Sequence, residues 1–141
     1  MSLTTTLNFF GQTESAVEFY RDYLDAEVLM TMRFSECHDP KLANPEFPDK
    51  IFHATFRIGG TQVMASDVGC HDPENVASFS GFALGLHVAS AEAAEKYFAA
   101  LAESGKVQVP MTETFFANRY GIVTDRFGVS WKIIAADEGV S

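Results

Sequence analysis

The sequence has few cysteines, few basic residues and no long apolar run. Two cysteines in 141 residues are too few for a disulfide scaffold, so we expect reduced thiols. Ten Lys and Arg stand against 19 Asp and Glu, and the net charge of −9 argues against nucleic acid and anionic membranes as partners. No apolar run approaches the roughly 18 residues of a membrane span, and the first residues contain no basic signal region. We therefore expect a cytoplasmic protein.

Apolar residues are abundant, and they repeat. Hydrophobic residues make up 47% of the chain and include 13 Phe, which is ample for a packed interior. A β-like run, Thr4–Phe10, precedes a helical pattern, and both recur at an offset of 77 residues, beginning at Phe82–Val88. Thr13 and Ser90 are the candidate N-caps of the two helices. The buried helix faces are expected to contain Val17, Tyr20 and Leu24 in the first copy and Ala94, Tyr97 and Leu101 in the second.

Three strand candidates follow each helix. In the first half they are Val28–Ser35, Phe52–Ile58 and Gln62–Ala65, with a Gly59-Gly60 turn between the last two. In the second half they are Val107–Met111, Tyr120–Thr124 and Val129–Ile134. The pattern predicts a βαβββ unit twice, over residues 1–68 and 81–141, with a polar linker at 69–80 and one structural domain overall.

The last strand candidate places a lysine opposite the core. Asp125–Gly128 is a tight reversal in which Gly128 is expected to have positive φ. Beyond it, Val129, Trp131 and Ile133 alternate with polar or smaller residues, so one face packs on a core while Lys132 points to the other.

These units resemble the glyoxalase/bleomycin-resistance/dioxygenase superfamily, also called vicinal oxygen chelate. The segments Leu7–Gly11, Glu14–Tyr20, His53–Gly60, Val63–Asp67 and Tyr120–Trp131 are similar to its PhnB-like subgroup. The resemblance implies an α+β fold in which the two βαβββ units form an eight-stranded half-open barrel with the helices outside. Members often carry the name 3-demethylubiquinone-9 3-methyltransferase, but this sequence has no Gly-rich loop after a strand that could hold an adenosyl cofactor.

The resemblance also implies where a barrel metal would bind. Family ligands lie on the first and last strands of each unit, and those positions fall on Thr5, Met64 (or Ala65), Phe82 (or Ala83) and Lys132. None of these side chains is a ligand for a hard or borderline divalent ion, and the Lys132 ammonium would repel a cation. We therefore expect no barrel metal and no cofactor.

An apolar cavity with a few polar groups is the usual form of a small-molecule site. Catalytic candidates are His53, as an acid or base, and Lys132; for each, a structural role is the competing interpretation. Arg119 and Tyr120 follow an aromatic segment, Thr114–Asn118, which is either a lid or a plug of the barrel mouth. Asp67 either orients a ligand or caps a turn. The candidate ligand-binding residues are Phe9, His53, Arg57, Asp67, Phe82, Arg119, Tyr120 and Lys132.

A repeated Cys-His-Asp-Pro sequence offers a different site. Cys37-His38 and Cys70-His71 could supply a Cys₂His₂ set for zinc if their loops meet. The competing interpretation is that each Asp-Pro pair starts a short helical turn. Adjacent Cys and His side chains do not readily turn toward one ion, which favours the second interpretation.

Two function classes remain, with a third ranked last. The first is a protein that binds a small organic molecule without a barrel metal. The second is a metal-free enzyme, lyase- or isomerase-like, acting on a small, possibly anionic substrate. The third is a divalent-metal-dependent enzyme of the glyoxalase or dioxygenase type. We also expect a homodimer, because an open half-barrel leaves a sheet edge to cover.

Overall fold

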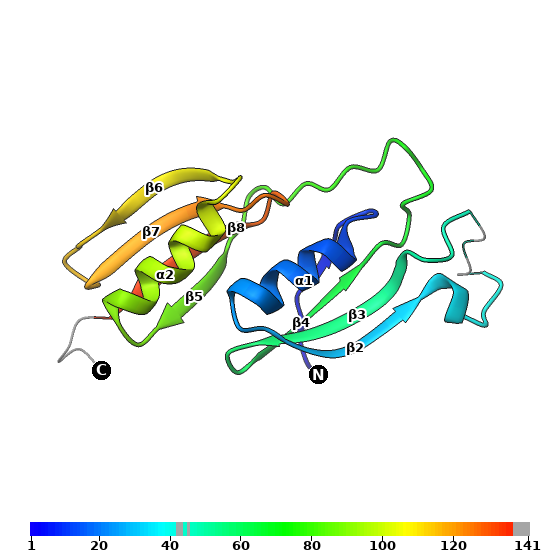
Figure 1. Ribbon diagram of the computed structural model, residues 1–141, viewed down its shortest axis with the longest axis horizontal. Coiled ribbons are helices and arrows are strands. Elements are labelled where there is room, and N and C mark those ends of the chain that lie inside the picture. Colours follow the sequence, from blue (N-terminus) through cyan, green and yellow to red (C-terminus); the bar gives the residue numbers. More distant parts are fainter. Residues whose placement is uncertain (42–43, 45, 137–141) are drawn as a thin grey trace. The chain divides into compact units, whose positions relative to one another are not determined.

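The structure is a computed structural model that describes residues 1–41, 44 and 46–136 (Figure 1). The chain divides into two compact units, Met1–Ala77 and Ser78–Ser141. This division falls inside the segment predicted as the linker. Each unit contains one helix and one four-stranded sheet.

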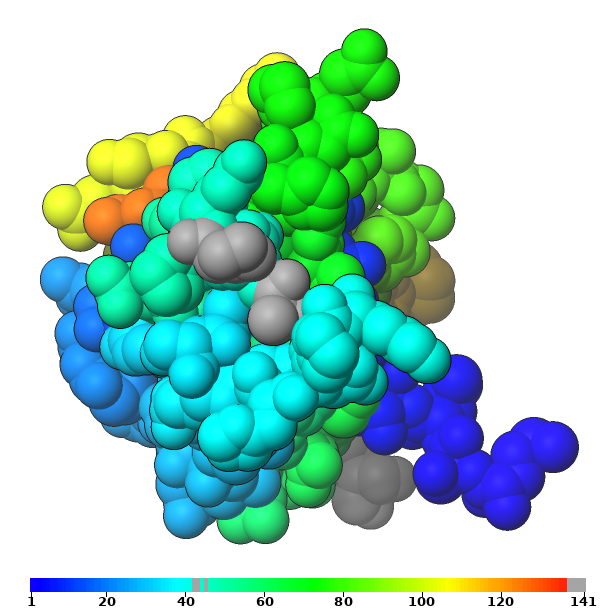
Figure 2. Space-filling view, turned by 90° about the vertical axis from the view of Figure 1, so that its right-hand side faces the viewer, coloured from blue at the N-terminus to red at the C-terminus, as the bar shows by residue number. Residues whose placement is uncertain are grey.

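The first unit consists of β1 (Thr6–Asn8), α1 (Thr13–Tyr23), β2 (Glu27–Arg33), β3 (Ile51–Ile58) and β4 (Thr61–Ser66), with a short 3₁₀ turn, η1, at Phe34–Glu36. The strand order is β1-β4-β3-β2, and only the β1–β4 pair is parallel. β1 is shorter than the predicted Thr4–Phe10, since the N-terminal segment extends away from the sheet with Leu3 99% exposed (Figure 2).

The second unit repeats this arrangement with β5 (Leu84–Val88), α2 (Ala91–Ala102), β6 (Lys106–Thr112), β7 (Arg119–Thr124) and β8 (Ser130–Ala135). Its order is β5-β8-β7-β6, again with one parallel pair, β5–β8. The α+β class and the two βαβββ units are confirmed. The described strands form two four-stranded sheets, and their assembly into a half-open barrel stays a prediction.

Each sheet is buried on one face only, because its single helix covers that face. In β3, Ala54, Phe56 and Ile58 are buried, and the Phe56 ring stacks on Tyr20 of α1 with centroids 5.9 Å apart. The alternate residues of β3 project from the opposite, open face, as strand geometry requires. In β8 the predicted alternation is confirmed, since Trp131 and Ile133 are buried and Lys132 is exposed.

The start of α1 differs from the prediction. Thr13 is the first helical residue and not the N-cap; the N-cap position is Gln12, whose side chain makes no capping bond. Asp67, the residue directly after β4, caps the helix instead. Its Oδ1 accepts hydrogen bonds from the N–H groups of Gly11 (2.7 Å) and Thr13 (3.1 Å) and from the Thr13 hydroxyl (2.6 Å). Its Oδ2 accepts from the Ile51 N–H at 3.0 Å. One buried carboxylate therefore joins α1 to β3 and β4.

The start of α2 agrees with the prediction, but its buried face differs by one residue. Ser90 is the N-cap, and its hydroxyl accepts from the Ala93 N–H at 3.1 Å. Ala94 and Leu101 are buried as expected, whereas Phe98 and not Tyr97 lies between them. Tyr97 and Phe98 are both at helical spacing from Ala94 and Leu101, and the fully apolar Phe98 is the one that is buried, while the phenol of Tyr97 stays partly exposed to water.

The reversal before β8 is confirmed as a turn. Gly128 has φ of +92°, and Asp125 Oδ1 accepts from the N–H groups of Phe127 and Val129. Asp125 Oδ2 also accepts from the Trp131 indole N–H at 2.9 Å, so the same carboxylate holds the buried Trp. This turn fixes the register of β8 and hence the direction of Lys132.

Replacing Asp67 with Ala should strongly destabilise the first unit. The four donors that now bind the carboxylate would lose their acceptor inside the protein, at a cost on the order of 3 kcal/mol or more. Urea unfolding followed by circular dichroism should show a midpoint lower by about 1 M or more. Asp72→Ala is the matched control, since Asp72 accepts a single exposed bond, from the Glu74 N–H. Equal midpoints for the two variants would contradict a structural role for Asp67.

Replacing Gly105 with Ala should destabilise the second unit by about 1–3 kcal/mol, because an added Cβ has no room. It would lie 2.3 Å from the Thr124 carbonyl oxygen and 2.7 Å from that of Leu101, and both are backbone atoms. At Gly60 no atom lies within 4 Å of such a Cβ. Gly60→Ala is therefore the control and should unfold at nearly the wild-type urea concentration. A tolerated Gly105→Ala would show that the chain at Gly105 does not approach Thr124 and Leu101 this closely.

Candidate functional site

Lys132 lies on the open face of the second sheet, and its direct neighbours on the two flanking strands carry no charge. Its register partners are Gly85 on β5 and Ile122 on β7. A Cβ at Gly85 would lie 3.6 Å from Nε2 of His87, so the imidazole leans over the glycine that is paired with Lys132. The ammonium of Lys132 has no ion-pair partner within residues 1–41, 44 and 46–136. A cation and an imidazole therefore share one part of this face.

A groove of about 490 Å³ covers this part of the sheet. That volume is within the range of small-molecule sites. No carboxylate is among the described residues that line it, and Lys132 is the one fixed positive charge there. Ser130 and Gln108 add hydrogen-bonding groups, with 3.5 Å between the Ser130 hydroxyl and Gln108 Oε1. The lining residues are Phe82, Ala83, Gly85, His87, Gln108, Ile122, Ser130, Lys132 and Ile134.

The candidates in the first unit do not gather at one site. His53 is half-buried on the open face of the first sheet, where its Nε2 lies 3.0 Å from the Thr55 hydroxyl. Arg57, farther along the same face, is paired with Glu27 at 3.3 Å. Phe9 is 2% exposed and belongs to the core. Asp67 is buried with four hydrogen bonds, a geometry that favours a structural role.

The candidates in the second unit lie in three places. Phe82 and Lys132 line the groove. Tyr120 is on the same face of β7 as Ile122, and its ring packs edge-on against Phe116, centroids 5.2 Å apart. Arg119 forms an ion pair with Glu95 of α2 at 3.2 Å, so its guanidinium interacts with the helix and not with the groove. Phe115 is 97% exposed next to Phe116. Whether this aromatic segment is a lid or a plug stays a prediction.

His87 and Gln108 line the groove but were not predicted as site residues from the sequence. A signal for His87 was present, because Leu84, Leu86 and Val88 alternate with Gly85 and His87 in β5. The same rule that placed Lys132 opposite the core places His87 there too. Gln108 alternates with Val107 and Val109 in the sequence, but the register of β6 against β7 shifts between Val107 and Val109, so alternation alone does not decide which face Gln108 is on.

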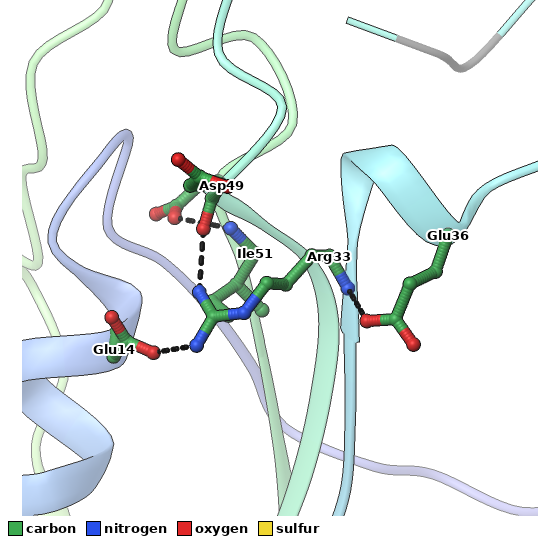
Figure 3. Close-up of polar contacts among 6 residues, drawn as sticks. Glu14, Arg33, Glu36, Asp49 and Ile51 are labelled. Carbon is green, nitrogen blue, oxygen red and sulfur yellow. Dashed lines mark hydrogen bonds and ion pairs between the residues drawn. The ribbon is translucent and has the colours of Figure 1, made fainter.

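A second groove, of about 210 Å³, lies between α1 and the strands β2 and β3. Its two positive charges already have partners, and the first of them, Arg21, pairs with Asp22 at 3.1 Å. Arg33 donates to Glu14 of α1 and, at 2.6 Å, to the Asp49 carbonyl, while its own N–H donates to Glu36 (Figure 3). The hydrogen bond to Glu14 raises the pKa of the Arg33 guanidinium above its ordinary value. This groove therefore offers less to a charged ligand than the groove at Lys132.

The residues at the positions where the family holds its metal do not suit a hard divalent ion. The register sets Thr6 opposite Met64 in the first unit and Gly85 opposite Lys132 in the second. The positions predicted from the helices, Thr5 and Phe82, both fall before these strands. Within the described part of the chain, no three His, Cys, Asp or Glu side chains gather to hold a metal.

The repeated Cys-His pairs do not form the zinc site considered above. Both pairs lie in the described part of the chain, and no cluster of three ligands includes them. The two cysteines are free thiols. Burial, followed by the nearby Asp67 carboxylate, raises the pKa of the Cys70 thiol. The second Asp-Pro pair instead sits in a turn, where Asp72 accepts from the Glu74 N–H.

Comparison with known proteins first establishes the fold class. The chain matches the glyoxylase/bleomycin resistance protein/dioxygenase domain from Frankia sp. EAN1pec with a TM-score of 0.67 at 16% identity, over 99% of this chain and 93% of that one. At this identity the likeness shows the fold alone. The predicted α+β fold class with two βαβββ units is thereby confirmed.

The particular family follows from closer matches. The model of the 3-demethylubiquinone-9 3-methyltransferase family, whose members are PhnB-like, matches residues 1–134, and the chain belongs to this family. It is 38% identical to the protein YjdN of Escherichia coli K12 over 94% of each chain. The protein PA1353 of Pseudomonas aeruginosa is 33% identical with a TM-score of 0.85 over 98% and 99% of the two chains. The PhnB protein of Bacillus cereus is 26% identical with a TM-score of 0.79, over 96% and 100%.

The family description implies a methyl donor, and the strand-to-helix turns do not fit one. In the first turn the N–H of Gly11 already donates to Asp67, and in the second the N-terminal Ala93 N–H donates to Ser90. Neither turn presents the free glycine-rich backbone that holds an adenosyl cofactor in nucleotide-binding folds. We therefore derive no methyl transfer.

Among the described residues, no helix is long and apolar enough to span a membrane.

Proposed function

We propose that this protein binds a small organic anion, without a barrel metal, in the groove on the open face of the second sheet. The observation that carries the proposal is Lys132, an ammonium without an ion-pair partner among the described residues, in a groove whose described lining has no carboxylate. A lysine in such a position provides a point charge for a carboxylate or phosphate group.

The other lining residues describe the rest of the ligand. Phe82, Ile122 and Ile134 present apolar surface along the groove, and Gln108 and Ser130 present donors and acceptors. Sites of this kind take most of their affinity from apolar contact and their orientation from a few polar groups. The ligand is therefore an apolar or aromatic body that carries one acidic group.

A metal-free enzyme is the second candidate, favoured by His87 beside Lys132. The imidazole could move a proton while the ammonium stabilises developing negative charge. A cytoplasmic location and a homodimer remain part of the proposal, and the homodimer is supported by the edge strands of the two sheets, such as β2 and β6.

Thermal unfolding with a panel of small aromatic and aliphatic carboxylates, phosphates and phosphonates tests the binding function. A ligand at one hundred times its Kd should add roughly 2.7 kcal/mol and raise Tm by several degrees. Lys132→Met should abolish this shift. Lys106→Met, which removes an exposed lysine outside the groove, is the control and should keep it. An undiminished shift in Lys132→Met, or no shift with any anion, would refute the proposal.

Gly85→Leu tests the location of the site without removing a charge. Gly85 is exposed on β5 and a Cβ there meets only ordinary contacts, so the fold should tolerate a side chain that fills the space beside Lys132. We expect wild-type stability without ligand and loss of the ligand-induced shift. If the variant still binds, the ligand lies elsewhere. Conversion of a bound anion, detected by mass spectrometry and lost in His87→Gln, would favour the enzyme.

A further inference from the structure

The open face of the first sheet collects methionines around His53. Register sets Met32 directly opposite His53, and both Met30 on β2 and Met64 on β4 opposite Thr55. Directly opposed residues lie on the same face of a sheet, with Cβ atoms about 5 Å apart. His53 and Thr55 are also on one face, as their hydrogen bond shows. Three of the five methionines in the chain therefore lie on the same face of the sheet as His53, one opposite it and two opposite Thr55.

The hydrogen bond of His53 prepares one ring nitrogen as a ligand. Nε2 lies 3.0 Å from the Thr55 hydroxyl, which is 8% exposed. If Nε2 carries the proton and donates it there, Nδ1 has a free lone pair, and residues 1–41, 44 and 46–136 give Nδ1 no hydrogen-bond partner. Histidines that bind metals commonly have this arrangement, in which the second nitrogen donates to a neighbouring oxygen and so fixes the tautomer.

The donor set determines which ion would bind. Thioether sulfur and neutral imidazole are soft or borderline ligands, and thioethers select Cu(I) over hard ions such as Mg²⁺, Ca²⁺ and Mn²⁺. No carboxylate is among the four donor residues, so a hard divalent ion has nothing to recognise here. The nearest cation on this face, Arg57, is paired with Glu27 at 3.3 Å, which offsets its charge.

Accessibility and flexibility also suit an ion entering from solvent. Met30 is 42% exposed, and Met32, Met64 and His53 are half-buried. Unbranched methionine side chains have three rotatable bonds, so sulfurs on neighbouring strands can converge without moving the backbone. Thr55 lies between Met30 and Met64 in the same row of the sheet. Thr55 is buried although it is on the open face, so other side chains cover it.

We infer that His53, Met30, Met32 and Met64 form a binding site for a soft monovalent ion, Cu(I) or its analogue Ag(I). This site is on the first unit and uses none of the residues that line the groove at Lys132. It is therefore independent of the proposed organic-anion function. Failure of one experiment leaves the other proposal unchanged.

Free thiols also bind Cu(I) and would compete with the thioethers. The test protein is therefore the Cys37→Ser/Cys70→Ser variant of the full chain. Anaerobic titration with Cu(I) against a chromogenic Cu(I) chelator should show one ion per chain. Met32→Leu/Met64→Leu retains apolar bulk and should weaken binding about ten-fold or more, and so should His53→Gln, as loss of metal-site groups typically does. The matched controls are Met111→Leu and His87→Gln, which lie in the second unit and should bind as tightly as the parent.

Nuclear magnetic resonance of methionine methyl groups gives a second measurement. Titration of the same thiol-free protein with Ag(I), which is diamagnetic, should shift the ε-methyl signals of Met30, Met32 and Met64. The signals of Met1 and Met111 should not move. Absence of Cu(I) binding, equal affinity in Met32→Leu/Met64→Leu, or methyl shifts confined to Met1 and Met111 would each overturn the inference.

Discussion

One helix can cover only one face of a four-stranded sheet, and most features of this protein depend on that constraint. Each unit has a single helix, so each sheet buries alternate residues and leaves the others on an open face. The buried set supplies the stability, through contacts such as Tyr20 against Phe56. The open set is free to vary, because no packing partner within its own unit restricts it. The side chains that could bind a ligand are therefore concentrated on these two faces.

The fold could be predicted from the sequence to the extent that local rules decide it. Strand alternation placed Trp131 inside and Lys132 outside, and the turn at Gly128 required only its neighbours. The helix start at Thr13 could not be predicted in the same way, because its cap is Asp67, a residue 54 positions away in the chain. A short-range rule searches for a cap beside the helix and has no means of finding one that folding brings to it.

The candidate site shows the same division. Lys132 followed from alternation, and His87 would have followed had the rule been applied to β5. Gln108 lies at an irregularity in the β6–β7 register, between Val107 and Val109, which alternation does not predict. Polar type alone was a poor guide, since Arg57 and Arg119 are both paired with carboxylates and Asp67 is enclosed. A charged residue indicates a binding site only when its partners are known, and partners are a property of the folded chain.

Duplication has given two units with equal architecture and different chemistry on their open faces. At the centre of one face are an imidazole and three thioethers, and at the centre of the other are an ammonium and an imidazole above a glycine. Neither the family description nor the shared fold determines this difference, because a common scaffold supports many activities through the residues placed on it.

The net charge of −9 repels an anion at long range, but the distances involved make this repulsion weak inside the groove. At physiological ionic strength charges are screened over about 8 Å, so acidic residues outside the groove act weakly on a ligand inside it. Two unit charges 4 Å apart near a protein surface interact by about 4 kcal/mol before the costs of desolvation. The local contact with Lys132 therefore exceeds the distant repulsion. The acidic exterior should mainly slow the approach of anionic ligands, while the carboxylate-free lining of the groove determines whether they stay.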